Sequence, residues 1–287
     1  MASNRPADPP DDLVARLGSL TAEARTRAQA HRTQVELALA LQRGMLPGEL
    51  PAAPGLSVAA RYAPAFAGLN VGGDWYDGFV LPDGSIGYSI GDVQGHTIEA
   101  AAFMGQVRVG LRALASVTSD PGELLGRTND LLLSLGGSLF ATCTMVRFDP
   151  VAWELDSARA GHVPLVRATA DGASGVVEDE GGLPLGIEPG VTYPVTRYRL
   201  TGRGAFVLVT DGVVEGPSLA VDEGLAQVAT LAGVGVGAAL GAESLATSVM
   251  RIADSIGHDD DAAVLVISHD APPQEAAPGD REGAGRS

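Results

Sequence analysis

Beyond Pro51 the sequence consists of short apolar segments separated by glycine-rich turns, and its helix-like segments are grouped instead of alternating with them. Segments with strand character are 57–62, 85–91, 139–148, 154–160, 165–168, 193–200, 205–210 and 262–268. Helical patterns occupy 98–117, 121–135, 223–232 and 243–256. Strands in runs, with helices grouped between them, predict an α+β fold with antiparallel sheets and argue against an alternating parallel fold.

The region before Pro47 has a different character. Residues 12–46 contain Ala, Leu, Arg, Gln and Glu but no proline, which predicts a helix ended by Pro47. Apolar residues at an approximate spacing of 3.5 form a seam with Arg27, His31 and Gln34 in its middle, a pattern typical of a weak coiled coil. Two interpretations stay open: a helix packed on its own domain, or an arm that pairs with a second copy in a homodimer.

We therefore divide the chain into four parts: a disordered leader (1–11), an N-terminal helical regulatory arm (12–46), a folded domain (47–269) and a disordered tail (270–287). One stretch, 225–242, is uncharged and reaches the minimum length of a membrane span. Its four glycines, with Gln227 and Thr230 inside, favour instead two short helices around a break at 233–237. We expect no membrane association.

The amino-acid composition excludes several classes of function. The chain carries 35 acidic against 19 basic residues, a net charge of −16, and every basic residue is Arg. The absence of lysine excludes Schiff-base and P-loop chemistry, and the acidity argues against a nucleic-acid partner. Cys143 is the single cysteine, so an intramolecular disulfide and a cysteine zinc site are excluded. With no secretory signal in the polar first twelve residues, we expect a cytoplasmic protein.

Four carboxylates share one context: Asp74, Asp92, Asp211 and Asp260 each lie at or near a strand end, most with glycine close by. Any one of them alone is explained by a turn, because turns favour Asp and Gly. If the four converged without a cation, they would repel one another and their pKa values would rise. Mg²⁺ and Mn²⁺ relieve such repulsion, and carboxylates spread along the chain suit a two-metal site that activates water.

The motifs around these residues resemble the metal-dependent Ser/Thr phosphatases of the protein phosphatase 2C class, in the bacterial branch typified by the sporulation stage II protein E and the sigma-B regulator phosphatases. They occur in family order and cover about residues 41–268. The matching strings are LQRGMLP (41–47), VGGDWYD (71–77), GDVQGH (91–96), AAAFM (100–104), AGHVP (160–164), LPLG (183–186), TDGVVE (210–215) and DDAAV (260–264).

The resemblance implies a four-layer α/β/β/α sandwich of two antiparallel sheets flanked by helices, with two Mn²⁺ or Mg²⁺ ions at one end. By position, Asp92 would bridge both metals and the Val93 carbonyl would bind the second. Asp211 and Asp260 would complete the first metal, and Asp74 would lie at the second. Asp92 and Asp211 are thus the expected catalytic residues, with a shared water as nucleophile on phosphoserine or phosphothreonine.

Several neighbouring residues depart from the family pattern or have other roles. Thr97 follows His96 where a second glycine is usual, and Glu99 stands where a small residue or proline is common. No general acid is obvious: His96 and His162 are candidates, although a core or turn role is favoured for each. The aromatic residues beside Asp74, together with Asp77, are expected to be structural. So are Glu215, as a helix or loop residue, and Cys143, as an inert strand residue.

The resemblance also implies a partner: a phosphorylated regulatory protein of the anti-anti-sigma-factor type, in a partner-switching control of transcription. Two alternatives remain open. One is a non-catalytic module that keeps the phosphatase fold to hold a phosphoprotein. The other is a calcium site used only for stability. An aspartyl-phosphate hydrolase is disfavoured, because such chemistry commonly needs a lysine.

Overall fold

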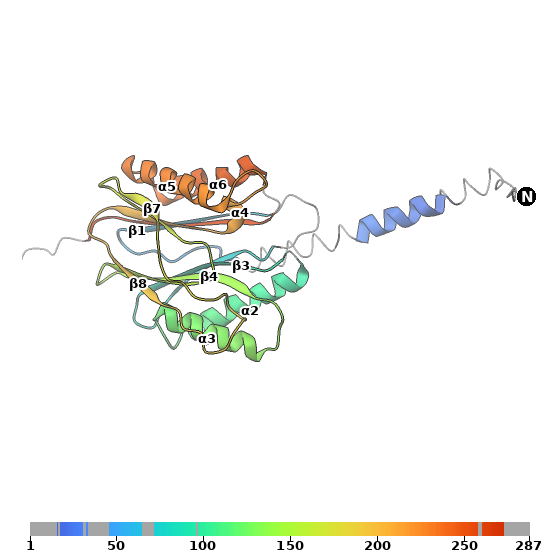
Figure 1. Ribbon diagram of the computed structural model, residues 1–287, viewed down its shortest axis with the longest axis horizontal. Coiled ribbons are helices and arrows are strands. Elements are labelled where there is room, and N and C mark those ends of the chain that lie inside the picture. Colours follow the sequence, from blue (N-terminus) through green and yellow to red (C-terminus); the bar gives the residue numbers. More distant parts are fainter. Residues whose placement is uncertain are drawn as a thin grey trace, which may run out of the picture.

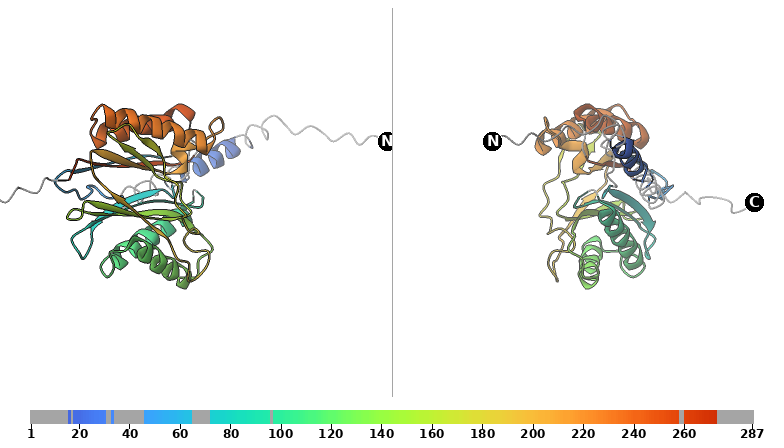
Figure 2. Two further views of the ribbon diagram at one scale, coloured as in Figure 1. Left: turned by 60° about the vertical axis from the view of Figure 1, so that its left-hand side comes forward. Right: turned by 90° about the vertical axis from the view of Figure 1, so that its right-hand side faces the viewer.

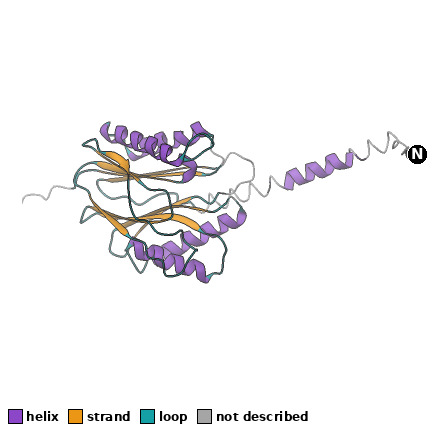
Figure 3. Ribbon diagram, in the orientation of Figure 1, coloured by secondary structure: helices purple, strands orange, loops and turns teal. Residues whose placement is uncertain are grey.

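The computed structural model describes residues 16, 18–30, 33, 46–64, 72–95, 97–257 and 260–272. From residue 46 onward these residues form four layers, with two helices outside each of two packed sheets (Figures 1 and 3). The views in Figure 2 show the same stack from the side. The predicted α+β sandwich of antiparallel sheets flanked by helices is confirmed.

The first sheet has the order β1-β10-β9-β6-β7 and the second the order β2-β3-β4-β5-β8, with every strand pairing antiparallel. The strands of the first sheet are β1 (Leu56–Ala63), β6 (Val166–Thr169), β7 (Ser174–Val176), β9 (Gly204–Val209) and β10 (Ala262–His269). Those of the second are β2 (Trp75–Val80), β3 (Ile86–Val93), β4 (Ala141–Asp149), β5 (Glu154–Ala160) and β8 (Val195–Arg199).

Alternation along the strands separates three apolar cores. In β10, Val264 and Val266 pack with α5 (Val221–Gly237) and α6 (Ala242–Ile256), whereas Leu265 and Ile267 face the second sheet. This follows from the two-residue side-chain period of a strand. A third core lies between the second sheet and the pair α2 (Ile98–Leu114) and α3 (Pro121–Ser134). Side chains capping α2 and α3 come from Thr97 and Asp120.

Most predicted elements occur within a few residues of their expected bounds, but β2, β7 and the short helix α4 (Asp211–Val214) were not predicted. The predicted break at 233–237 is wrong, because α5 continues to Gly237 as one helix. Two of its glycines lie at close contacts: a Cβ on Gly233 would be 2.7 Å from Ser174 Oγ, and one on Gly235 would be 3.0 Å from Leu245 Cδ1. These glycines let β7 and α6 pack closely against an uninterrupted helix.

Of the predicted N-terminal arm, residues 18–30 are helical and all of them are exposed. The rest of the arm apart from Arg16, Thr33 and Leu46, the whole leader and the tail beyond Pro272 lie outside the described residues. The division of the chain into leader, arm, domain and tail therefore stays a prediction. Among the described helices, none combines the length and apolarity that crossing a membrane requires.

Candidate metal centre

Four strands from the two sheets bring the predicted carboxylates to one end of the sandwich. Asp74 immediately precedes β2 and Asp92 lies near the end of β3, both in the second sheet. Asp211 follows β9 and Asp260 precedes β10, both in the first sheet. One carboxylate oxygen from each of Asp74, Asp92 and Asp211 lies within 4.8 Å of the other two. Residues up to 137 positions apart in the sequence therefore form one cluster (211 minus 74).

Asp74 is the most buried member, with 2% of its surface exposed. Thr210 Oγ1 donates a hydrogen bond to Asp74 Oδ2 at 2.7 Å and accepts one from the Ala263 amide at 2.8 Å. Because Thr210 directly follows β9, Ala263 lies in β10 and Asp74 directly precedes β2, this hydroxyl links segments of the two sheets at the cluster. Sequence analysis missed Thr210, and its only signal was its place in the string beside Asp211.

Burial and neighbouring negative charges raise the pKa values of these carboxyl groups. Burial raises the pKa of Asp92 to about 8, and the charges of Asp211 and Asp260 add to this effect. Burial and the charge of Asp92 likewise raise the pKa of Asp74, while the hydrogen bond from Thr210 opposes the shift. The pKa of Asp211 is raised by burial and by Asp260. No arginine or histidine among the described residues forms an ion pair with Asp74, Asp92 or Asp211.

Gly73 lets the segment that carries Asp74 lie close to the end of β3. A Cβ at this position would overlap the Val93 carbonyl oxygen and lie 2.9 Å from Asp92 Oδ1. The Val93 carbonyl and the Asp92 carboxylate therefore face the same small space, beside a residue with no side chain. This is consistent with the main-chain ligand that the resemblance implies for Val93.

The adjacent acids Asp260 and Asp261 occupy different environments. Asp260 is exposed and lies outside the group of three, although its charge raises the pKa values of Asp92 and Asp211. Asp261, which was not predicted as a site residue, is 1% exposed and accepts a hydrogen bond from Tyr62 Oη at 2.6 Å. Burial and the charges of Asp261 and Asp74 raise the pKa of Tyr62. Tyr62 and Asp261 thus form a hydrogen-bonded pair next to the carboxylates.

The two histidine candidates have different outcomes. His96 lies outside the described residues. His162 is buried, its Nδ1 lies 2.9 Å from Thr142 Oγ1, and burial lowers its pKa to about 4. A neutral, buried imidazole fits the core role that was favoured for it.

The structural roles expected around Asp74 also have a physical basis. Trp75 is fully buried, and a Cβ on Gly91 would overlap its ring. Asp77 is 1% exposed and accepts hydrogen bonds from Arg108 Nη2 at 3.0 Å and from Arg112 Nε at 2.9 Å. Cys143 is fully buried, which raises the pKa of its thiol.

The cluster fits divalent cations. Its donors are carboxylate oxygens with a carbonyl beside them, which is the ligand chemistry that Mg²⁺ and Mn²⁺ prefer. The described residues supply no cationic side chain to neutralise it, and burial together with repulsion between the carboxylates raises their pKa values. Bound cations would remove that repulsion. Asp74, Asp92, Asp211 and the Val93 carbonyl are the groups placed to hold them, with Asp260 at the rim.

Comparison with known proteins agrees with the motifs. The sequence profile of the family described as Stage II sporulation protein E (SpoIIE) matches residues 82–270, about two thirds of the chain. The chain belongs to this family. The family match spans β3 to β10 and includes Asp92, Asp211 and Asp260, whereas Asp74 precedes it.

Individual relatives of this SpoIIE-family chain include the phosphoserine phosphatase RsbU of Bacillus subtilis, which is 27% identical over 188 residues, 65% of this chain and 55% of RsbU. Protein IcfG of Synechocystis is 26% identical over 217 residues, 66% of this chain and 33% of IcfG. The chain therefore spans about half of the first relative and a third of the second.

Solved structures with a similar fold include two bacterial proteins. The RsbU and RsbW domains of Rv1364c from Mycobacterium tuberculosis superpose with a TM-score of 0.71 at 32% identity, covering 80% of this chain and 64% of that one. The PP2C phosphatase domain of SpoIIE from Bacillus subtilis superposes with a TM-score of 0.63 at 19% identity, covering 75% and 62%. The four-layer sandwich is thus the fold of PP2C phosphatases.

Proposed function

We propose that this SpoIIE-family chain is a metal-dependent protein phosphatase that hydrolyses phosphoserine or phosphothreonine. The observation that carries the proposal is the convergence of Asp74, Asp92 and Asp211 within 4.8 Å at one end of a PP2C-type sandwich. The expected cofactor is Mn²⁺ or Mg²⁺, with two ions at the site. Such ions, when bound, lower the pKa of water and neutralise charge on phosphoryl oxygens.

The protein residues would contribute position and charge. Asp92, near the end of β3, and Asp211, which follows β9, bring carboxylate oxygens within 4.8 Å of each other. Thr210 fixes the Asp74 carboxylate with a 2.7 Å hydrogen bond, so Asp74 needs no reorganisation when a ligand arrives. Gly73 leaves the Val93 carbonyl accessible beside Asp92. Asp260, exposed at the rim, would complete the first ion's ligand set.

We further propose a phosphorylated regulatory protein of the anti-anti-sigma-factor type as substrate, acting in partner switching. The support is the similarity to RsbU, named a phosphoserine phosphatase, and to the RsbU domain of Rv1364c. Its −16 net charge gives the chain little general attraction for a phosphoprotein, so recognition would depend on the cation-loaded centre and on local contacts.

The test is phosphate release from an aryl phosphate and from a phosphoserine peptide during a Mn²⁺ titration, followed by EDTA. We expect activity that requires the metal and stops with chelator.

Asp92→Asn should lower turnover at least about a thousandfold while circular dichroism stays unchanged, since the bridging ligand supports several kcal/mol of transition-state stabilisation. Near-normal turnover of this variant would contradict the assignment. Tight Mn²⁺ binding without hydrolysis of any phosphopeptide would favour the non-catalytic binding module.

A further inference from the structure

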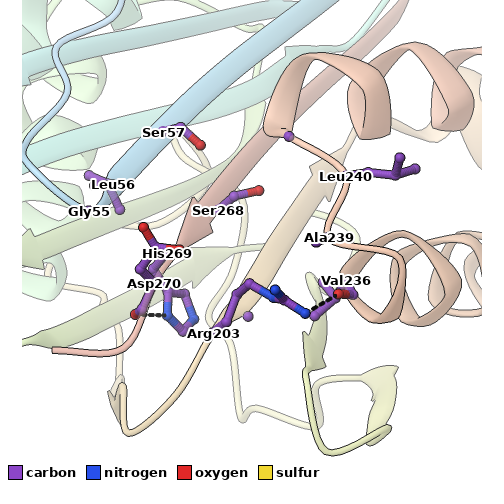
Figure 4. Close-up of a pocket in the computed structure, with 12 residues that line it drawn as sticks. Gly55, Leu56, Ser57, Arg203, Val236, Ala239, Leu240, Ser268, His269 and Asp270 are labelled. Atoms are coloured by element: carbon purple, nitrogen blue, oxygen red, sulfur yellow. Dashed lines mark hydrogen bonds between the residues drawn. The ribbon is translucent and has the colours of Figure 1, made fainter.

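Two adjoining pockets lie at the end of the sandwich where β10 ends and β9 begins. Their volumes are about 320 and 620 Å³, and Arg203 and His269 line both. Figure 4 shows the smaller one, between the end of β10 and the α5–α6 connection. β10 runs from Ala262, beside the carboxylate cluster, to His269, so at ~3.3 Å per residue about 23 Å separates its ends. These pockets are therefore separate from the candidate metal centre.

His269 presents an unused nitrogen here. The side chain is 3% exposed, and its Nδ1 lies 3.2 Å from the Asp270 carbonyl oxygen, a contact drawn in Figure 4. Because a carbonyl oxygen only accepts, Nδ1 carries the proton of the neutral ring and Nε2 carries a lone pair. Nε2 makes no hydrogen bond with any described residue, although buried polar atoms in proteins are nearly always paired.

The neutral form of this ring is the favoured one. Burial lowers the pKa of His269, and the Arg167 guanidinium lowers it further, while the carbonyl groups of Asp270 and Gly202 act in the opposite direction. Nε2 lies above Gly204, where a Cβ would come within 2.8 Å of it. The absence of a side chain at Gly204 therefore keeps space next to the unused lone pair.

Arg167 brings a second unused nitrogen to the larger pocket. Its guanidinium carbon lies 5.5 Å from the ring centroid of Tyr198 and 5.8 Å from that of Phe206, so two aromatic faces hold the group. Its Nε is buried and makes no hydrogen bond within the described part of the chain. Arg203, which also lines this pocket, donates from Nη2 to the Val236 carbonyl at 3.1 Å (Figure 4).

Most other arginines of the sandwich are neutralised by acids. Of the eleven described from residue 46 onward, eight form ion pairs: Arg61, Arg108, Arg112, Arg127, Arg147, Arg159, Arg197 and Arg199. The other three, Arg167, Arg203 and Arg251, form no ion pair with a described residue, and the first two line one pocket. Asp171 and Asp270 also line the pockets and are exposed, as is Arg203; the charge of Arg167 contributes to the lowered pKa of Asp171, but neither acid forms an ion pair with a described arginine.

We propose that this end of the sandwich binds a small oxyanion carrying a hydroxyl group, either a hydroxycarboxylate or a hydroxylated phosphate ester. The guanidinium groups of Arg167 and Arg203 donate to the oxyanion, for which their planar donor sets are suited. The ligand's hydroxyl donates to His269 Nε2. One ligand thus satisfies both unused nitrogens, and the larger pocket has room for it.

The experiment is calorimetric titration of the full chain after metal removal with EDTA and dialysis, so that the probes cannot act as metal chelators or phosphatase substrates. The probes are L-malate against succinate, which lacks the hydroxyl, and glycerol 3-phosphate against propyl phosphate, which lacks both alcohol hydroxyls. We expect saturable binding of malate or glycerol 3-phosphate, at least about tenfold tighter than its partner without the hydroxyl. Malate alone identifies a carboxylate ligand, and glycerol 3-phosphate alone a phosphate ester.

Arg203→Gln should weaken that binding at least about tenfold, whereas the control Arg251→Gln, on the exposed face of α6, should leave it unchanged. Circular dichroism checks that both variants are folded. No saturable binding of any probe up to about 10 mM, or binding that Arg203→Gln does not affect, would overturn the proposal. Mn²⁺-dependent phosphatase activity, measured separately, is expected to persist in Arg203→Gln, so the two proposals fail independently.

Discussion

The carboxyl group of Asp92 lies buried among other acids, and its pKa is raised to about 8. This raised pKa predicts how the stability of the metal-free protein depends on pH. In the unfolded chain an aspartate ionises near pH 4. Between about pH 4 and pH 8 the metal-free folded state therefore binds more protons than the unfolded state at this site, so its free energy of unfolding falls as pH rises. The stability from a protonated Asp92 is present at acidic pH and lost as pH passes 8.

We expect Asp92→Asn, which carries no charge at any of these pH values, to melt higher than the metal-free wild type at pH 8, on the order of 5 °C. At pH 4 the two proteins should melt at similar temperatures. The measurement is thermal unfolding in EDTA across this range. A melting-temperature difference that does not grow with pH would contradict the electrostatic description of the cluster.

Gly73 gives a second prediction for a single residue. In Gly73→Ala the new Cβ would overlap the Val93 carbonyl and crowd Asp92 Oδ1, so one of these groups must move. We expect Mn²⁺ affinity to fall at least about tenfold in calorimetry, with circular dichroism unchanged. Gly48→Ala is the matched control, because a Cβ there has no heavy atom within 4 Å. Equal affinities in the two variants would mean that the Val93 carbonyl is not part of the centre.

Single residues also show what the sequence could and could not predict about the site. Asp74, Asp92 and Asp211 could be found because each stands in a short motif at a strand end. Thr210, Tyr62 and Asp261 could not, since Thr210 acts through a contact with Asp74 beside the other sheet, and Tyr62 contacts Asp261 only because β1 pairs with β10. The Tyr62 hydrogen bond to Asp261 joins residues 199 positions apart, and no local pattern indicates it.

Among the secondary-structure elements, β2 and α2 are joined by one buried charge. Asp77 of β2 is 1% exposed and pairs with Arg108 and Arg112 of α2. Asp77→Ala would leave Arg108, whose side chain is 11% exposed, without its counter-charge. We expect the free energy of unfolding to fall by about 3 kcal/mol.

The control for this element is Arg127→Ala in α3, which removes an exposed pair with Glu123. Its expected cost is below about 0.5 kcal/mol. Urea unfolding of both variants provides the comparison. Similar losses in the two would show that the Asp77 cluster contributes no more than a surface ion pair. Asp77 lies three residues after Asp74, so loss of its ion pairs with α2 in Asp77→Ala should also reduce Mn²⁺ affinity.

The secondary-structure elements also show where sequence patterns predict the structure and where they do not. The alternating strand β5 and the continuous apolar strands β9 and β10 were predicted nearly at their observed bounds. β2 was not, because Asp77 and Gly78 interrupt its pattern, and the arginines that neutralise Asp77 come 31 and 35 residues later. α5 was predicted too short because glycines normally end helices. The close contacts at Gly233 and Gly235 are tertiary and could not be inferred from the segment itself.

For the whole molecule, the N-terminal arm raises the question of assembly. All of residues 18–30 are exposed, so this part of the arm does not pack on the described domain, and its pairing with a second copy stays a prediction. We expect deletion of residues 1–46 to convert a dimer into a monomer in light scattering. Deletion of residues 1–11 alone is the control and should leave the dimer intact. An unchanged oligomeric state in the longer deletion would contradict the dimer arm.

The central claim is that the two sheets close around a divalent-cation centre made by Asp74, Asp92 and Asp211. Calorimetric titration of the metal-free protein with Mn²⁺ tests it most directly, because it needs neither a substrate nor an activating partner. The prediction is saturable binding with proton release, as carboxyl groups of raised pKa ionise around the metal, and loss of most of that binding in Asp92→Asn. Absence of binding, or equal binding by wild type and Asp92→Asn, would contradict the account.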